Sequence, residues 1–167
     1  MLGIVSPKPR SFDENRGQFS DVVLTIGKEI FYVLKKFLAS KSAYFNSMFF
    51  SNYAESGRDL IQPQAIDPRD FQNFLEAVHE EGEIDDSSIE GIRHLADMYI
   101  ASTALSVCEK FLPFESKLTS KKLFDISKKY QLNKLADKCV SIMTINELTA
   151  VLKEEGLTTV IIKMLAE

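Results

Sequence analysis

Residues 20–55 read SDVVLTIGKEIFYVLKKFLASKSAYFNSMFFSNYAE, and this stretch decides the fold. Apolar side chains alternate with their neighbours over residues 22–26 and again over 31–33, which is the period of two of a β-strand. Gly27 and Lys28 separate the two runs, and glycine readily takes the positive φ that a tight hairpin turn needs. The stretch is therefore predicted to begin with a β-hairpin.

The second half of this stretch has the spacing of helices. Leu38, Phe45 and Phe49 recur at helical intervals, and Ser42 lies where its hydroxyl can cap a second short helix that starts at Ala43. We therefore expect two short helices to follow the hairpin directly.

The hairpin and the helix pair resemble the opening of a BTB domain, also called a POZ domain. In that family a strand that begins with Asp leads to a second strand ending in Val/Ala-His-Lys. A helix pair with the pattern Leu-Ala-Ala/Ser-x-Ser-x-x-Phe-x-x-Met-Phe then follows. The matching residues here are Asp21, Val33-Leu34-Lys35, Leu38-Ala39-Ser40-Lys41-Ser42-Ala43-Tyr44-Phe45 and Met48-Phe49.

The chain departs from the family pattern at Leu34, which stands where relatives usually have His. Relatives can build a charged pocket from the Asp, the His and a basic residue at the position of Lys41, and that pocket is incomplete here. The residues themselves suggest another role for Asp21, as a strand-edge residue that accepts local backbone hydrogen bonds.

The resemblance implies an α+β chain with the BTB/POZ fold, in which helices pack around a small three-stranded sheet and helical hairpins follow. Residues 58–62 are the predicted third strand, and Pro63 ends it. The sequence is divided into an N-terminal arm at 1–19, a BTB/POZ domain at 20–113 and a C-terminal helical extension at 114–167.

A further helix is predicted to start at Asp67 and Pro68. An aspartate side chain can cap a helix, and proline suits the first helical position. The apolar stripe of this helix is formed by Phe71, Phe74, Leu75 and Val78.

From residue 86 onward the chain is predicted to be helical and to contain a two-copy repeat, in which residues 95–112 align with residues 126–143. The first copy resembles the closing helices of a BTB domain. The second resembles the helix pair that follows in BTB proteins serving cullin ubiquitin ligases. Shorter helices are predicted at 145–152, capped by Asn146, and at 160–165. The aligned pairs are Leu95 and Ile126, Tyr99 and Tyr130, Cys108 and Cys139, Phe111 and Ile142, and Leu112 and Met143.

Composition narrows the classes of function. The 167 residues are 45% hydrophobic, enough for a core, and the net charge of -4 argues against a nucleic-acid partner. Acidic residues concentrate between 76 and 90 and lysines between 117 and 138, and both runs are interpreted as solvated faces. No apolar run has the length of a signal peptide or a membrane span, so we expect no membrane partner and a cytoplasmic or nuclear location.

Residues that could carry chemistry are few. His79 and His94 lie on separate predicted helices outside any catalytic motif and are expected to face solvent. Cys108 and Cys139 have no further Cys or His at the spacing of metal ligands, so we interpret both as buried core thiols. The sequence therefore predicts neither an enzyme nor a bound cofactor or metal.

The resemblance supplies two candidate contact sites. Ubiquitin-ligase adaptors of this family carry a hydrophobic-x-Glu tripeptide that docks on a cullin, and Tyr53 and Glu55 match it, with Phe49 beside them. The alternative to a cullin contact is that Tyr53 packs over the helix end and that Glu55 is solvated. Phe37 matches a position at the homodimer interface of BTB proteins, and burial in the monomer core is the alternative.

The function implied is that of a protein-interaction module. We expect a homodimeric BTB adaptor that recruits a cullin scaffold for the ubiquitylation of a substrate, whose identity the sequence does not give. One alternative is a BTB oligomerisation module in transcription or scaffolding that binds no cullin. Another is an adaptor that grips a separate recognition subunit with its helices between 120 and 165.

Overall fold

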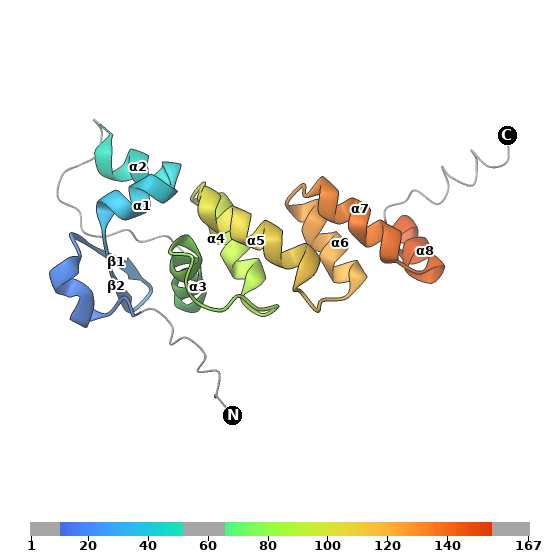
Figure 1. Cartoon of the computed structure of the whole chain (residues 1–167), viewed down its shortest axis with the longest axis horizontal. Helices are drawn as coiled ribbons and strands as arrows, with labels where there is room; N and C mark the ends of the chain where they lie inside the picture. The colour runs from blue at the N-terminus through green and yellow to red at the C-terminus, as the bar shows by residue number, and fades with distance from the viewer. Residues whose placement is uncertain (1–10, 52–65, 155–167) are drawn as a thin grey trace, which may run out of the picture. The chain divides into compact units, whose positions relative to one another are not determined.

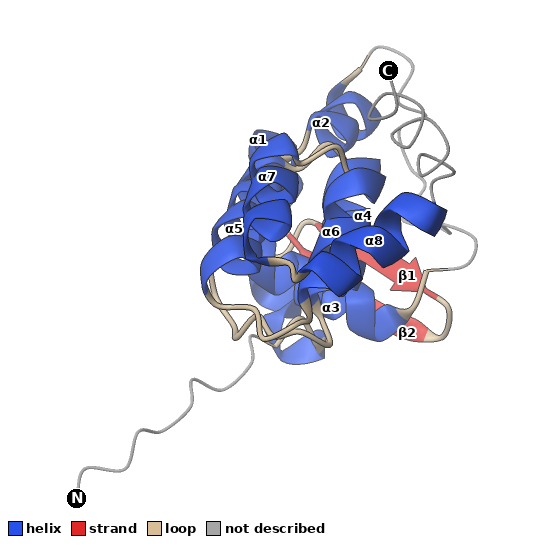
Figure 2. Cartoon of the chain, turned by 90° about the vertical axis from the view of Figure 1, so that its right-hand side faces the viewer, coloured by secondary structure: helices blue, strands red, loops and turns tan. Residues whose placement is uncertain are grey.

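The structure is a computed structural model and describes residues 11–51 and 66–154. Its contacts divide the chain into two compact units, one reaching to Phe111 (unit 1) and one starting at Leu112 (unit 2). Helices make up most of the described chain, and one short hairpin lies near its N-terminal end (Figures 1 and 2). This is the α+β composition that the sequence predicts.

The hairpin pairs β1 (Val22–Ile26) with β2 (Glu29–Val33) in antiparallel register, Val22 opposite Val33 and Ile26 opposite Glu29. Gly27 has a φ of 62° in the turn, as the sequence predicts. The described residues contain a two-stranded sheet rather than the predicted three-stranded one. The predicted third strand at 58–62 lies outside the described residues.

The segment before β1 is folded against the hairpin. Glu14–Phe19 form a 3₁₀-helix, η1, whose N-cap Asp13 accepts a hydrogen bond from the Asn15 backbone N–H. Phe12 is buried, and its carbonyl accepts a hydrogen bond of 2.7 Å from the Tyr32 N–H of β2. The prediction of an arm over 1–19 is therefore wrong for residues 12–19, because the burial of one aromatic residue anchors them.

Two short helices follow the hairpin, α1 (Lys35–Lys41) and α2 (Ala43–Phe50). Ser42 lies between them and caps α2, because its hydroxyl accepts a hydrogen bond of 3.2 Å from the Phe45 N–H. The same hydroxyl donates to the Tyr99 carbonyl, and Ser42 is buried. The predicted cap is confirmed, and it also ties this helix pair to a distant part of unit 1.

Helix α3 (Pro68–Val78) begins as predicted, because the Asp67 carboxylate accepts a hydrogen bond of 2.7 Å from the Arg69 N–H. Its predicted apolar stripe is buried. Helix α4 (Ile89–Met98) packs against α3, and Gly91 permits the close approach because a Cβ there would clash with the Asp70 carboxylate. Partial burial raises the pKa of Asp70.

Helices α5 (Ser102–Phe114), α6 (Ser120–Lys129) and α7 (Asn133–Ile142) confirm the predicted repeat. Helices α5 and α7 start at equivalent positions of the two copies, and α4 and α6 both have a tyrosine at their C-cap. The last helix of the described residues is α8 (Ile145–Glu154), and the predicted helix at 160–165 lies beyond them.

The cap of α8 differs from the prediction. Thr144, rather than Asn146, starts the helix through a capping box. The Thr144 hydroxyl accepts from the Glu147 N–H at 3.3 Å, and the Glu147 carboxylate accepts from the Thr144 N–H at 2.8 Å. These hydrogen bonds lower the pKa of Glu147. Two reciprocal hydrogen bonds stabilise the start of the helix more than the single hydrogen bond that an Asn146 cap would form.

Cys108 and Cys139 are both free and buried, as the sequence predicts. Burial raises the pKa of the Cys108 thiol to about 12 and also raises that of Cys139. Both cysteines are therefore core residues that stay protonated in the folded chain at neutral pH.

Replacing Ser42 with Ala should lower the free energy of unfolding by about 1–3 kcal/mol, because the Phe45 N–H and the Tyr99 carbonyl would both lose their hydrogen-bond partner. Urea unfolding followed by circular dichroism measures the change. Ser40→Ala is the matched control, since that exposed hydroxyl donates to a carbonyl of its own helix and its loss should cost at most about 0.5 kcal/mol. Equal losses in both variants would contradict the role assigned to Ser42.

Stability should fall at alkaline pH through Cys108. In the unfolded chain its thiol ionises near 9.0, whereas the folded chain keeps it neutral up to about 12. Its contribution is therefore complete below pH 9.0 and is lost progressively as the pH rises to about 12. The measurement is urea unfolding over this pH range, in which Cys108→Ala should show a shallower decline than the wild type. Parallel declines would contradict the prediction.

Candidate protein-interaction site

Phe37 of α1 is half-buried and stacks on His79, which caps the C-terminal end of α3. The two ring centroids lie 4.0 Å apart and the planes differ by 11°. The Phe12 ring approaches the same imidazole at 5.5 Å. His79, which was expected to face solvent, is therefore half-buried between two phenylalanine rings. Sequence reasoning missed this contact because Phe12, Phe37 and His79 are far apart in the sequence and meet only in the folded unit.

The charges beside this stack are Lys41 and Glu80. The Lys41 ammonium lies 6.0 Å from the centroid of the Phe37 ring and 3.5 Å from the Glu80 carboxylate. An ion pair this exposed contributes at most about 1 kcal/mol to stability. The stack is therefore held mainly by aromatic packing, with a polar rim.

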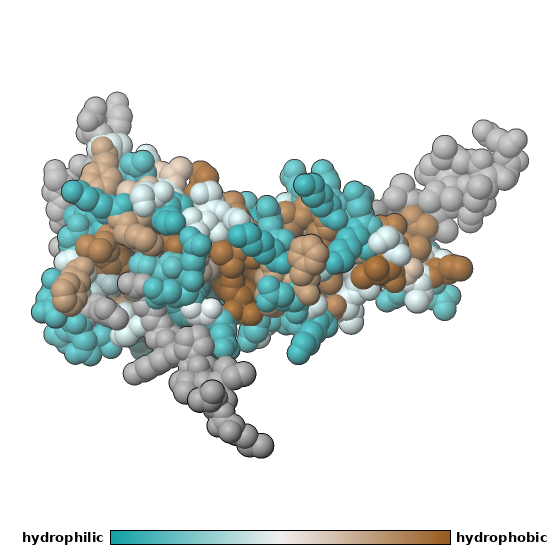
Figure 3. All heavy atoms as spheres, in the orientation of Figure 1, coloured by the Kyte–Doolittle hydropathy of each residue, from teal (hydrophilic) through white to brown (hydrophobic). Residues whose placement is uncertain are grey.

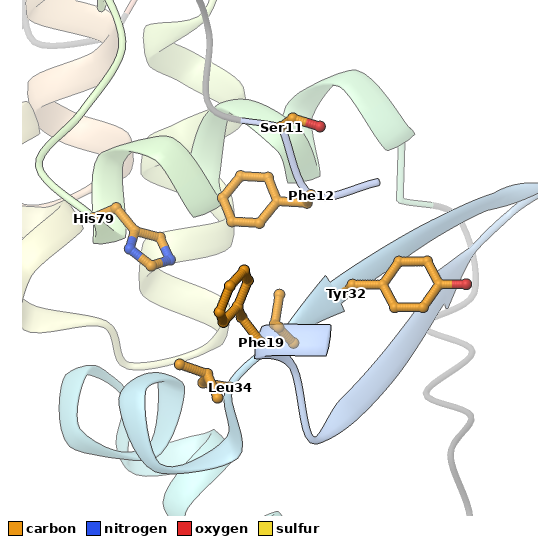
Figure 4. A pocket seen from close by; sticks show the side chains of 7 residues that line it. Ser11, Phe12, Phe19, Tyr32, Leu34 and His79 are labelled. Carbon is orange, nitrogen blue, oxygen red and sulfur yellow. The ribbon is translucent and has the colours of Figure 1, made fainter. Parts of the chain in front are cut away.

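A hollow of about 90 Å³ lies next to the stack, and the side chains around it gather from η1, β2 and the end of α3 (Figure 4). Phe19, on its edge, is 64% exposed, and Leu34 is also exposed. Leu34 therefore adds an exposed apolar side chain to this surface. The residues that line the hollow are Ser11, Phe12, Phe19, Tyr32, Val33, Leu34 and His79.

Asp21 stabilises the start of α1. Its carboxylate accepts a hydrogen bond of 2.6 Å from the Lys35 N–H, while the N-cap residue Leu34 has no capping side chain of its own. The predicted role as an acceptor of backbone hydrogen bonds is confirmed, although the donor is 14 residues away rather than local. Asp21 thereby orients the helix that carries Phe37.

Phe49, the first residue of the predicted cullin contact, is half-buried near the end of α2. Its ring stacks on Phe45 at 5.8 Å, and Phe50 contacts it edge-on at 6.3 Å. Phe50 is exposed and was not selected from the sequence, because its position on the outer face of a short helix carries no motif. Tyr53 and Glu55 lie outside the described residues.

Side chains that could bind a metal ion do not cluster in the described residues. Within them, no three His, Cys, Asp or Glu side chains are grouped so that they could hold a metal ion. His94 is exposed on α4, apart from His79. No helix in this part of the chain is both long and apolar enough to cross a membrane. Exposed apolar side chains do lie on the described surface, among them Phe19, Leu34 and Phe50.

Residues 12–116 match the family model described as BTB/POZ domain. The match covers more than half of the chain and begins at Phe12, the residue that anchors the segment before the hairpin. The chain therefore belongs to the BTB/POZ domain family, whose domains are protein-interaction modules rather than enzymes.

Two curated relatives illustrate the range of the family. The chain is 43% identical over 141 residues to BTB and MATH domain-containing protein 15 of Caenorhabditis elegans, an alignment that covers 84% of this chain and 52% of that protein. It is 31% identical over 98 residues to human Kelch-like protein 26, covering 58% of this chain and 16% of that protein. The chain thus spans about half or less of the length of these relatives.

Among solved structures, the BTB domain of zebrafish PATZ1 is similar to this chain with a TM-score of 0.49 and 23% sequence identity. This match covers 59% of the chain and 80% of that domain.

Proposed function

We propose that this chain is a homodimeric BTB adaptor that recruits a cullin scaffold, so that a protein held by the complex becomes ubiquitylated. The alignment with the BTB and MATH protein carries the proposal, because its 141 residues extend beyond the match to the BTB model at 12–116. The likeness therefore includes helices of the C-terminal extension, which resembles the helix pair of cullin-binding BTB proteins. The chain would supply contacts and proximity, and it would transfer nothing itself.

Homodimerisation is supported by the apolar surface around Phe37. BTB domains generally dimerise, and an interface between identical copies with two-fold symmetry must be complementary to itself. Phe19, Leu34 and Phe37 place exposed or half-exposed apolar side chains beside the hollow, so one surface offers both projections and a recess. Such a surface suits a second copy of the chain.

The wild-type protein should be a dimer at micromolar concentration, with a light-scattering mass near twice 18.9 kDa. Phe37→Asp should yield a monomer, because burial of an unpaired charge in the interface is unfavourable. Circular dichroism must show that the variant stays folded, since Phe37 also packs on His79.

The matched control for the dimer is Phe114→Asp, which introduces the same charge at a phenylalanine of α5 that is 81% exposed in unit 2. This variant should remain a dimer. A monomeric wild type at tens of micromolar, or a Phe37→Asp variant that is folded and still dimeric, would show that Phe37 is not an interface residue.

The cullin contact is supported by the position of Tyr53 and Glu55 in the sequence just after α2, where the family's hydrophobic-x-Glu tripeptide stands. An aromatic side chain that fills an apolar pocket, next to a carboxylate that accepts a charged hydrogen bond, is a common combination at interface hot spots. Phe49 and Phe50 add aromatic surface on the preceding turn of α2.

Tyr53→Ala should weaken the binding of a purified cullin N-terminal domain by about 2 kcal/mol or more, roughly thirtyfold, because truncation empties the aromatic's pocket. Glu55→Ala should cost less if its partner stays solvated. Isothermal titration calorimetry measures both affinities, with circular dichroism as the folding control.

Glu83→Ala is the matched control for the acidic variant, because it removes an exposed carboxylate from the loop between α3 and α4. It should bind the cullin like the wild type. Undetectable wild-type binding at tens of micromolar would refute the adaptor function and leave an oligomerisation module. If Tyr53→Ala and Glu55→Ala both bind the cullin with wild-type affinity, the cullin contact lies elsewhere on the chain.

A further inference from the structure

His79 places an ionisable ring in the surface around Phe37. Its imidazole stacks on the Phe37 ring, with centroids 4.0 Å apart and planes that differ by 11°, and the Phe12 ring lies 5.5 Å away. The imidazole also lines the hollow next to the stack, where Figure 4 shows it beside the ring of Phe12. Histidine is the side chain whose charge ordinarily changes between about pH 5 and pH 8. The charge of this surface therefore depends on pH in that range.

Two charged side chains lie beside the stack. The Lys41 ammonium of α1 is 6.0 Å from the centroid of the Phe37 ring, and its like charge disfavours a protonated imidazole. Glu80 follows His79 in the chain and favours the protonated form, but its carboxylate is exposed and lies 3.5 Å from the Lys41 ammonium. The two charges therefore largely offset each other at the imidazole.

The described elements around the hollow contribute other ionisable groups, but these keep their charge near neutral pH. Before β1, Phe12 is uncharged and the carboxylate of Asp13 caps η1. Strand β2 contributes Tyr32, and tyrosine side chains are neutral between about pH 5 and pH 8. Glu76, one turn before the histidine on α3, is buried and accepts a hydrogen bond from the Gln72 side chain. Near neutral pH, the histidine is therefore the group that changes the charge of this surface.

The two-fold symmetry of a homodimer would bring this ring into the interface twice. Each copy would place its Phe37, with the His79 stacked on it, against the same surface of the other copy. Helix α1 carries three lysines and no acidic residue, so the two copies would already bring like charges together. A protonated imidazole on each side would add a positive charge that the partner shields from water, which is unfavourable. The neutral imidazole packs as one more aromatic ring.

Apolar side chains reach the surface among hydrophilic ones in several places on the face shown in Figure 3. What the surface around Phe37 adds is an ionisable ring stacked on its apolar ones. We propose that His79 makes the homodimer sensitive to pH, so that the neutral imidazole favours the dimer and the protonated imidazole favours separate chains. This inference rests on the proposed function, because the dimer is part of it. The dimer is strongest above the pH range in which histidine titrates, and it weakens as the pH falls through that range.

Sedimentation equilibrium measures the dissociation constant of the dimer at pH 7.5 and at pH 5.5, on either side of the ordinary histidine pKa of about 6.5. For the wild type this constant should be at least about tenfold higher at pH 5.5, because each dimer holds two copies of His79 and each contributes up to about tenfold. His79→Phe keeps the aromatic stack without an ionisable group, so its constant should be nearly the same at both pH values. His94→Gln is the matched control, because it removes the exposed histidine of α4 and should keep the wild-type pH dependence.

Lys41→Met tests the charge argument independently of the ring. This variant removes the like charge beside the stack and leaves Glu80 to favour the protonated imidazole. The rise in the dissociation constant between pH 7.5 and pH 5.5 should therefore be smaller than in the wild type. Circular dichroism at both pH values checks that each variant stays folded.

The outcomes separate the pH dependence from the proposed function. A dimer that weakens at pH 5.5 in the wild type and in His94→Gln, but not in His79→Phe, supports the inference. If the wild type has the same constant at both pH values, or if His79→Phe weakens equally, the inference is refuted and the dimer stands. If His79→Phe does not fold or dimerise, Lys41→Met decides: a smaller pH dependence supports the inference and an unchanged one overturns it. A wild type that is monomeric at pH 7.5 overturns the dimer and the inference together.

Discussion

Tyr99 joins three helices of unit 1 through its ring and its backbone carbonyl. Its ring lies among Phe45 of α2 and Phe71 and Phe74 of α3, and its carbonyl accepts the hydrogen bond from Ser42. Its hydroxyl is buried without a hydrogen-bond partner, and burial raises the pKa of this phenol. The residue is therefore held by ring packing, which outweighs the cost of one unsatisfied hydroxyl.

This packing fixes the surfaces that could contact other proteins. The hydrogen bonds from Ser42 and Ala43 to residues 99 and 100 set the start of α2 against the end of α4. Asp21 independently sets the start of α1, which carries Phe37. The surface around Phe37 and the surface of α2 are thus positioned by different interactions. A substitution on one surface can therefore leave the other intact.

Local signals in the sequence were enough to predict most elements, and contacts between distant segments were not. Gly27, Ser42 and Asp67 act on neighbouring backbone groups, so their roles follow from sequence alone. The burial of Phe12 and the stacking of His79 depend on segments far apart in the chain, and neither residue lies in a periodic pattern. For the candidate site, Phe37 and Phe49 were found by resemblance, whereas the stacking of Phe37 on His79 is visible only in the fold.

The two copies of the repeat show which positions the fold constrains. Inward residues correspond closely, with Tyr99 and Cys108 in one copy and Tyr130 and Cys139 in the other. Charge does not correspond, because residues 95–112 carry two acidic residues and one basic residue whereas residues 126–143 carry one acidic and four basic ones. Burial restricts only the inward stripe, so the outer faces are free to diverge. The two helical hairpins therefore present outer faces of different charge although their inward stripes share one framework.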